Sequence, residues 1–270
     1  MKGKGIDISE NNGNIDFAKV KQDGIDFVII RIGWIGNKEN HTLDKKFEEY
    51  YAGAKAVGLQ IGFYVYSYVT SKSGMLSAIN WVKNKITGKT REYPIFIDVE
   101  DGQIWNLRKE QLTNLCKYFC ENFENSGIYA SLDWFKNKLN VKKLTNYKIW
   151  LAQWTSSSNH SANFKVDLWQ YADNGKVNGI NGNVDMNKCL NCNENTGEIG
   201  SDEEVRVYQN GSTIENVYSD TNLTNKIGSL NKYEACYCLG IFNNRAMVRY
   251  NVDGSNNYKI GFCKWLGGVK

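Results

Sequence analysis

PIFIDVEDG (residues 94–102) is an apolar run that opens with the only proline of the chain and ends among three acidic residues. Side chains alternate between the two faces of a strand, so Phe96, Asp98 and Glu100 share one face. The other face is apolar and is expected to pack under helices: Ile95, Ile97 and Val99. Asp98 and Glu100 then have Cα atoms about 6–7 Å apart at the carboxyl end of the strand. Asp101 falls on the opposite face from this pair and is predicted to be structural.

Similar apolar runs recur along the first 190 residues. Eight of them are strand-like: residues 5–9, 27–33, 61–69, 94–100, 127–131, 147–154, 166–172 and 182–186. Three intervening segments have helical periodicity or end on the glycine typical of helix termini. These segments are residues 43–58, 74–88 and 112–123. Strands that alternate with helices predict a parallel sheet.

After residue 131 the gaps between strand-like runs become short and polar, which leaves little room for full helices. The pattern predicts an α/β fold, a (β/α)₈-like barrel whose last third is degenerate. An open doubly wound sheet is the alternative, and it is disfavoured because no G-x-G-x-x-G follows the first strand.

The chain changes character after this barrel. Residues 1–192 form the predicted barrel domain, and residues 193–204 are a polar, acidic, glycine-bearing linker. Residues 205–270 contain short strand-like runs separated by Gly, Asn and Asp, which predicts a small all-β barrel.

Composition restricts the class of protein. The formal charge of +4 and the lack of a basic tract interleaved with aromatics give no support for nucleic-acid binding. No run approaches the roughly 18 apolar residues of a membrane span, and the N-terminus has no secretory signal pattern. We therefore expect synthesis in a cytoplasm without membrane insertion.

Cysteines and histidines offer little for metal or nucleophile chemistry. The seven cysteines lack the spacing of a disulfide framework, so reduced thiols are expected, with Cys116 and Cys120 as core residues. Cys189 belongs to a lone C-x-x-C without a second ligand pair, which argues against zinc. With only His41 and His160 available, no histidine triad is expected, and we predict neither metal nor cofactor.

Acidic residues at other strands join Asp98 and Glu100. Asp7 stands at the end of the first predicted strand and Asp185 at the end of the eighth, beside the seam where a barrel closes. All four acids would face the carboxyl end of the barrel, where barrel enzymes keep their chemistry. Crowded, buried carboxyls gain proton affinity, as a general acid requires. The alternative is that Asp98 and Glu100 bind a lysine or cap the next helix.

Aromatic residues accompany the acids. The third strand places Tyr64, Tyr66 and Tyr68 on one face, and later strands contribute Trp150, Trp154 and Trp169. An acidic pit ringed by Tyr and Trp suits a glycan, since sugar rings have apolar C–H faces and many hydroxyls. The alternative is that these aromatics belong to the barrel core. Together with the acids they favour a glycoside hydrolase.

Several motifs together resemble the glycoside hydrolase family 25 lysozymes over residues 4 to about 190. These are GIDIS…NG, FVIIRIGW, GFYVYSY, YPIFIDVED, LAQW, LWQY and GNVDMN. The C-terminal region, which includes IGSL and CYCLGIFNNRAMVRYNV, is similar to the Src-homology-3-like wall-binding module of clostridial phage endolysins. The resemblance implies an N-acetylmuramidase without a cofactor, a monomer that hydrolyses the peptidoglycan of Gram-positive walls and causes host lysis.

The resemblance also implies roles for individual residues. Glu100 matches the general acid/base and Asp98 its partner carboxylate, while Asp7 and Asp185 match the other acids of the cleft. Substrate contacts are expected at five aromatic or amide positions: Tyr64, Tyr66, Gln153, Trp154 and Trp169. In this family Asp98 would orient the acetamido group of the substrate as that group attacks the anomeric carbon. Attack by a water activated by a carboxylate is the alternative.

Two other functions compete with the muramidase. An inert glycan-binding protein could use the same barrel, but the presence of all four acids favours an enzyme. An amidase or peptidase lysin lacks its zinc or its cysteine and histidine constellation here. The absence of a signal sequence fits an endolysin released to the wall through a holin pore, and an autolysin exported by another route is the alternative. For the C-terminal region, the alternative to wall anchoring is a stabilising or oligomerising appendage.

Overall fold

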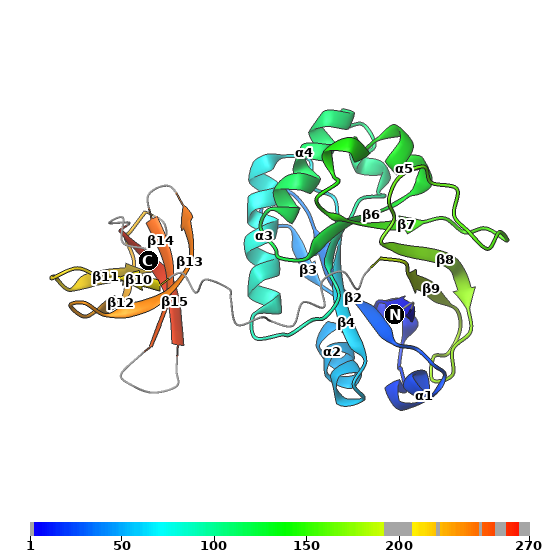
Figure 1. The fold of residues 1–270 in the computed structure, drawn as a ribbon, viewed down its shortest axis with the longest axis horizontal. Helices are drawn as coiled ribbons and strands as arrows, with labels where there is room; N and C mark the ends of the chain where they lie inside the picture. Colours follow the sequence, from blue (N-terminus) through cyan, green and yellow to red (C-terminus); the bar gives the residue numbers. More distant parts are fainter. Residues whose placement is uncertain (1–2, 192–206, 220–221, 243–244, 252–257, 265–270) are drawn as a thin grey trace. The chain divides into compact units, whose positions relative to one another are not determined.

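The computed structural model describes residues 3–191, 207–219, 222–242, 245–251 and 258–264 (Figure 1). The chain divides into two compact units, Met1–Asn195 and Thr196–Lys270, and each is considered by itself. The predicted linker at residues 193–204 lies outside the described residues.

The first unit is built on an eight-stranded barrel with one short strand added at the side. In order around the barrel the strands are β1 (Lys4–Ile8), β2 (Phe27–Ile35), β4 (Gln60–Ser67), β5 (Ile95–Asp98), β6 (Ser126–Ser131), β7 (Lys148–Ala152), β8 (Leu168–Gly175) and β9 (Val184–Cys189). The barrel closes because β1 pairs with both β2 and β9. The added strand, β3 (His41–Leu43), pairs antiparallel with β2 and was not predicted. All eight predicted strands are present, so the barrel prediction is confirmed.

Strand direction differs from the prediction in one place. The barrel is parallel from β1 through β8, but β9 pairs antiparallel with both β8 and β1. A parallel return needs a crossover of about a dozen residues or more. Residues 176–183 are too short for that and contain no helix, so β9 runs back along β8. The last third is therefore degenerate, as predicted, and its final strand is reversed.

Helices cover the outside of the parallel part of the barrel (Figure 1). They are α1 (Phe17–Gln22), α2 (Phe47–Ala56), α3 (Lys72–Ile86), α4 (Lys109–Cys120) and α5 (Leu132–Asn137), with short 3₁₀ turns η1 (Glu10–Asn12), η2 (Gly102–Ile104) and η3 (Val141–Lys143). The three predicted helices correspond to α2, α3 and α4. Helix α4 begins three residues earlier than its apolar periodicity indicated, because its first turn is polar and exposed.

The side chains of each barrel strand alternate between two apolar layers, one between the barrel and the helices and one inside the barrel. Ile95, Ile97 and Val99 are at most 1% exposed and pack in the layer between barrel and helices, as predicted. Phe96 packs inside the barrel, where its ring lies 5.1 Å from that of Trp150. Other members of this inner cluster include Phe27, Ile29, Tyr64, Tyr129 and Leu168. The barrel interior is thus filled with aromatic and aliphatic side chains.

The cysteines of the first unit follow the prediction at two positions and depart from it at a third. Cys116 and Cys120 are buried thiols of α4, and burial raises the pKa of Cys120 to about 12. Cys189, at the end of β9, is disulfide-bonded, so the expectation of reduced thiols is wrong there. Sequence spacing could not show this, because a disulfide depends on how the chain brings two sulfurs together.

The second unit is a six-stranded antiparallel sheet in the order β10-β13-β14-β15-β11-β12. Its strands are β10 (Val207–Gln209), β11 (Glu215–Tyr218), β12 (Lys226–Leu230), β13 (Ala235–Phe242), β14 (Arg245–Asn251) and β15 (Tyr258–Lys264). Buried residues shared by several strands form its core, among them Val217, Leu230, Ala246, Val248 and Tyr250.

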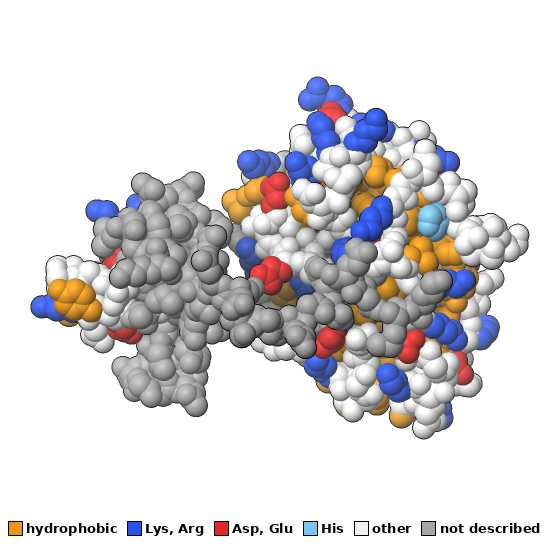
Figure 2. All heavy atoms as spheres, in the orientation of Figure 1, with side chains coloured by type: hydrophobic (Ala, Val, Ile, Leu, Met, Phe, Trp, Pro, Cys, Tyr) orange, Lys and Arg blue, Asp and Glu red, His pale blue; other side chains and the backbone are white. Residues whose placement is uncertain are grey.

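Charges on the visible face of the first unit are dispersed. Lys and Arg side chains lie scattered among uncharged ones in Figure 2 rather than in one continuous strip. Among the described residues, no helix combines the length and apolarity needed to cross a bilayer.

Candidate active site

The four predicted acids meet at one mouth of the barrel. Asp98 is the last residue of β5, and Glu100 follows two residues later. Asp7 of β1 lies directly opposite Asp185 of β9 in the antiparallel pair. All four acids lie near Tyr129. Burial raises the pKa of the Tyr129 hydroxyl, and the charges of the four acids raise it further. Because β9 is reversed, Asp185 lies near the start of its strand rather than at the predicted end, yet it faces the same mouth.

Asp7 and Asp185 form a hydrogen-bonded carboxyl pair. Asp7 Oδ2 accepts hydrogen bonds from Gln170 Nε2 at 3.0 Å and from Asn187 Nδ2 at 2.7 Å. Burial raises the pKa of Asp7, and these amides, together with Asp185, oppose the rise. Burial and then the charge of Asp7 raise the pKa of Asp185 to about 9. The amide donors favour the carboxylate on Asp7, so Asp185 holds the proton that the pair shares.

Asp98 is a buried carboxyl with an unused acceptor. It is 3% exposed, and its Oδ1 has no hydrogen-bond partner among the described residues. Burial raises its pKa well above the ordinary value, the charges of Glu100 and Asp7 add to the rise, and Arg31 opposes it. Buried polar atoms normally have partners, so an exception requires an explanation. Here the free oxygen can receive an N–H from a ligand in the mouth.

Glu100 combines access to solvent with a raised pKa. Its side chain is exposed at the mouth, unlike that of Asp98. Desolvation by the surrounding protein raises its pKa, the charges of Asp7 and Asp101 add to this, and a hydrogen bond with Tyr129 opposes it. An accessible carboxyl that keeps its proton at higher pH is suited to general acid catalysis.

Backbone pairing fixes the directions of these two acids. Val99 N donates to Tyr129 O at 3.1 Å, so the strand-like alternation continues beyond β5 toward Glu100. Asp101 then ends the strand. Its Oδ1 accepts from Gln103 N at 2.8 Å and caps η2, and its Oδ2 accepts from the Tyr66 hydroxyl at 3.1 Å. Asp101 thus has the structural role predicted for it.

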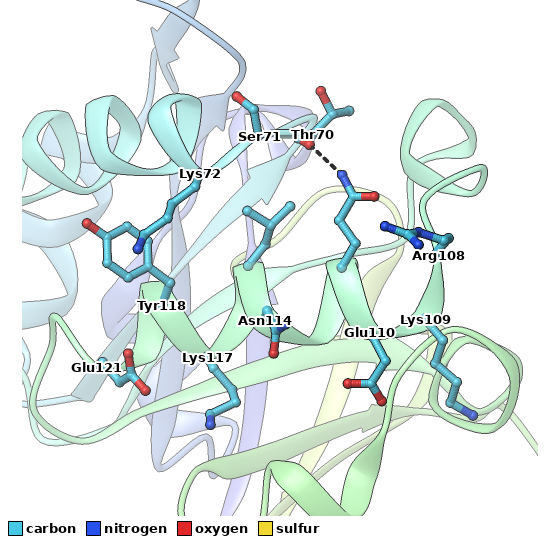
Figure 3. Close-up of a pocket in the computed structure, with 12 residues that line it drawn as sticks. Thr70, Ser71, Lys72, Arg108, Lys109, Glu110, Asn114, Lys117, Tyr118 and Glu121 are labelled. Atoms are coloured by element: carbon cyan, nitrogen blue, oxygen red, sulfur yellow. Dashed lines mark hydrogen bonds between the residues drawn. The ribbon is translucent and has the colours of Figure 1, made fainter.

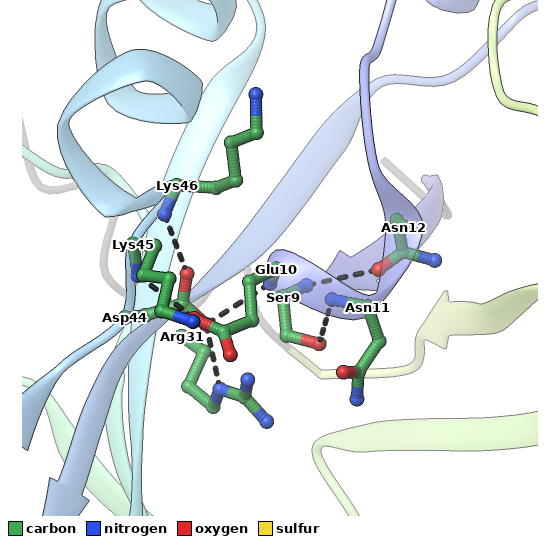
Figure 4. A network of polar contacts seen from close by, with 8 residues as sticks. All are labelled: Ser9, Glu10, Asn11, Asn12, Arg31, Asp44, Lys45 and Lys46. Atoms are coloured by element: carbon green, nitrogen blue, oxygen red, sulfur yellow. Dashed lines mark hydrogen bonds and ion pairs between the residues drawn. The ribbon is translucent and has the colours of Figure 1, made fainter.

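A buried ion pair joins Arg31 of β2 to Asp44, the residue that follows β3 (Figure 4). Asp44, whose side chain is fully buried, accepts from Arg31 Nε at 2.7 Å, from Glu10 N at 3.0 Å and from Lys46 N at 2.8 Å. The Arg31 guanidinium also lies 4.0 Å from the centre of the Trp34 ring. This network holds a positive charge beside the acids, which otherwise repel one another. The sequence offered one signal that was missed, an arginine inside the apolar run FVIIRIGW.

Three of the five predicted substrate contacts lie where a ligand in the mouth could meet them. Tyr64 lies in the barrel interior at 9% exposure, with the charge of Asp7 adding to the burial that raises its pKa. Tyr66 is half-buried next to Asp98 in the sheet register. Trp154 is 57% exposed, and its Nε1 donates to Gln170 Oε1 at 3.1 Å. An exposed indole beside the acids is suited to stack on a sugar ring.

The other two predicted contacts are engaged elsewhere. Trp169 points to the outer face of β8, is 2% exposed and packs 5.7 Å from His160. Its predicted contact with substrate is therefore corrected, since alternation turns Trp169 away when Gln170 points inward. Gln153 uses its amide to hold the following loop, through bonds of 2.8 and 2.9 Å with Ser161. These bonds leave Gln153 with a role in positioning that loop.

Three inward-facing residues were not predicted: Tyr129, Gln170 and Asn187. Gln170 Oε1 accepts from the Tyr129 hydroxyl at 3.1 Å while its Nε2 donates to Asp7, so it joins β6, β8 and β1. Asn187 accepts from Trp150 Nε1 at 2.8 Å and donates to Asp7. Strand alternation from Leu168 would have placed Gln170 inside the barrel. Within the described residues, no group of three or more His, Cys, Asp or Glu side chains could hold a metal ion.

The acid cluster predicts that the first unit becomes less stable as pH rises from 5 to 9. Folded-state pKa values of Asp7, Asp98, Glu100 and Asp185 are all raised, so unfolding releases protons in this range. Their stabilising effect is complete below about pH 4 and is lost as pH rises through the folded values, by up to about 1.4 kcal/mol per pH unit for each proton released.

Urea unfolding followed by tryptophan fluorescence at pH 5, 7 and 9 would measure this dependence. The slope should be shallower in Asp185→Asn, which removes the group whose pKa is raised to about 9. A free energy of unfolding that increases from pH 5 to pH 9 would contradict the assigned proton binding.

The part of the chain that carries this site is similar to known proteins. The sequence profile described as Glycosyl hydrolases family 25 matches residues 6–180. The autolytic lysozyme of Clostridium acetobutylicum is 30% identical over 191 residues, which cover 68% of this chain and 55% of that protein. This chain thus spans about half the length of that relative.

Two solved structures share the fold at lower identity. The CTP1L endolysin is 23% identical, with a TM-score of 0.57, and the match covers 70% of this chain and 66% of that one. The spore cortex lytic enzyme SleM of Clostridium perfringens is 16% identical, with a TM-score of 0.62, and the match covers 97% of this chain and 98% of that one. The second likeness is not confined to the barrel unit.

Proposed function

The chain belongs to family 25 of the glycosyl hydrolases, and from this premise we propose that it is an N-acetylmuramidase. Its substrate would be the β-1,4 bond between N-acetylmuramic acid and N-acetylglucosamine in peptidoglycan. One observation carries the proposal: an accessible acid with a raised pKa, Glu100, stands beside a buried acid with a free acceptor oxygen, Asp98. An inert glycan-binding protein would not require either feature.

The two acids supply complementary steps. Glu100 gives its proton to the glycosidic oxygen as the bond between that oxygen and the anomeric carbon breaks. Asp98 accepts the acetamido N–H, so the acetamido carbonyl oxygen is oriented to attack the anomeric carbon and close a five-membered ring. A water molecule then opens this ring, with Glu100 taking the proton of the water and returning to its acid form. The buried, unpartnered Asp98 Oδ1 favours this course over a water activated directly by a carboxylate.

Asp7 and its partners would stabilise the charge that develops on the sugar. The anomeric carbon becomes cation-like in the transition state. Asp7 is held as a carboxylate by Gln170 and Asn187, and Asp185 supplies the shared proton. A fixed negative charge in a site with little water acts more strongly than one in bulk solvent.

Mass spectrometry of digested peptidoglycan tests the reaction. We expect disaccharide peptides with new reducing N-acetylmuramic acid ends, which the Glu100→Gln variant does not produce. Free stem peptides without new reducing ends would instead identify an amidase or peptidase. New reducing N-acetylglucosamine ends would show that a different glycosidic bond is cut.

The proposal extends to the biological setting. We propose an endolysin that acts as a monomer on Gram-positive walls after holin-mediated release and causes host lysis, because the motifs of both regions resemble clostridial phage endolysins. The second unit would anchor the enzyme to the wall as a Src-homology-3-like module. Its six-stranded antiparallel sheet and the fold likeness of SleM over 97% of this chain support a dedicated second domain.

A further inference from the structure

A groove of about 970 Å³ lies on the outside of the barrel, between the segment that leads into α3 and the surface of α4 (Figure 3). None of the four acids lines it, so it is separate from the candidate active site. Its lining comes from two stretches of chain: Thr70, Ser71 and Lys72 on one side, and Arg108, Lys109, Glu110, Gln111, Asn114, Leu115, Lys117, Tyr118 and Glu121 on the other.

Positive charge prevails in this groove. Its four cations are Lys72, Arg108, Lys109 and Lys117. The lining also contains two acids, Glu110 and Glu121. They neutralise the four positive charges only in part, because Glu110 already pairs with Lys143 outside the groove. Among the described residues, none of the four cations takes part in an ion pair. Such uncompensated cations attract an anionic ligand.

Contacts across the groove keep its walls in place. Gln111 Nε2 donates to Thr70 O at 3.1 Å, which is the dashed line in Figure 3. Lys72 Nζ lies 5.0 Å from the centre of the Tyr118 ring. Leu115, which also lines the groove, is 5% exposed. The groove therefore has an apolar base and a charged rim, which together suit a peptide with carboxylates rather than a simple ion.

Chain connectivity relates the groove to the barrel mouth. Tyr68, two residues before Thr70, has its ring 5.2 Å from that of Tyr66, whose hydroxyl bonds Asp101. On the other wall, η2 leads from Asp101 toward Arg108, the residue that precedes α4. The two strands that carry Tyr66 and Asp98 therefore continue into the two walls of the groove. A branch that leaves a sugar bound in the mouth could follow these walls outward.

We propose that this groove binds the acidic peptide branch carried by the N-acetylmuramic acid residue whose bond is cleaved. This inference rests on the proposed function, which supplies the sugar to which the peptide is attached. The peptide is joined to that sugar through its lactyl ether, so binding of the glycan brings its carboxylates to the rim at high effective concentration. Binding there would make the enzyme prefer peptide-bearing strands over bare glycan.

The test compares two substrates made from one preparation: soluble peptide-bearing glycan strands, and the same strands after an amidase has removed the peptides. A full-length triple variant, Lys72→Ala, Arg108→Ala and Lys117→Ala, removes three groove charges. The matched control, Lys4→Ala, Lys21→Ala and Lys176→Ala, removes three exposed charges that do not line the groove. The measured quantity is the ratio of kcat/KM for peptide-bearing strands to kcat/KM for bare strands.

We expect the groove variant to lower this ratio about tenfold, as three partly exposed charge contacts would, and the control to leave it unchanged. The preference should also weaken in 0.5 M salt, because salt screens exposed charges. An unchanged ratio in the groove variant, or an equal fall in the control, would overturn the inference while leaving the muramidase intact. A wild-type protein that cleaves neither substrate would refute the proposed function itself.

Discussion

Glu100→Gln is expected to lower the turnover of peptidoglycan about a thousandfold without loss of stability. A glutamine side chain has the shape of Glu100 but no proton to give to the departing sugar oxygen, and general acid catalysis contributes about 10²–10⁴-fold in rate. The side chain is exposed at the mouth, so the substitution removes no core packing. Initial rates of turbidity loss and of reducing-end formation would measure the effect, with thermal unfolding as the check on folding.

A matched substitution distinguishes loss of the proton donor from loss of one negative charge at the surface. Glu39 is exposed and takes part in no ion pair among the described residues, so Glu39→Gln should keep wild-type activity. If Glu100→Gln retained activity within a few-fold of Glu39→Gln, another group would be the proton donor. The high-pH limb of the wild-type rate profile should reflect the raised pKa of Glu100, with activity falling as this carboxyl loses its proton.

Asp98→Asn is expected to move activity and stability in opposite directions. Turnover should fall by about 10²–10³-fold, because an asparagine amide cannot stabilise the acetamido group as a carboxylate does. The free energy of unfolding near pH 8 should rise by on the order of 1–2 kcal/mol, the usual size of gains at strained functional positions. The reason is that Asp98 is buried, faces the charges of Glu100 and Asp7, and has an oxygen without a partner.

The control for this variant is again Glu39→Gln, which changes an exposed carboxyl that takes part in no ion pair among the described residues. It should alter neither turnover nor stability appreciably. Parallel measurement of kcat and of urea unfolding at pH 5 and pH 8 would distinguish the two effects. The stability gain should shrink at the lower pH, because the raised pKa of Asp98 favours its neutral form as pH falls. An Asp98→Asn variant that is less stable at pH 8 would show that the carboxylate holds the fold together.

Much of the barrel followed from local patterns. Alternation in PIFIDVEDG predicted the buried face of Ile95, Ile97 and Val99 and the inward direction of Phe96, and the rhythm of strands and helices predicted the eight strands. These features depend on neighbouring residues, whose spacing fixes which face each side chain takes. The same alternation predicted that Tyr64 and Tyr66 point to the inner side of the sheet, toward the acids.

Errors arose where partners come from distant parts of the chain. The direction of β9 depended on the length of its connection. The bonds of Gln153 to Ser161 depend on the path of a loop that has no periodicity. None of these follows from the composition of a single strand.

The sequence by itself determined that a barrel would form and that Asp98 and Glu100 would stand together at the end of its β5, because alternation along one strand is a local property. Only the tertiary structure decided what each acid can do. It set Asp185 against Asp7, placed Arg31 beside the cluster, left Asp98 Oδ1 without a donor and kept Glu100 open to solvent. Burial, charge and hydrogen bonding at a carboxyl are sums over every element that surrounds it, and those elements come together only in the folded chain.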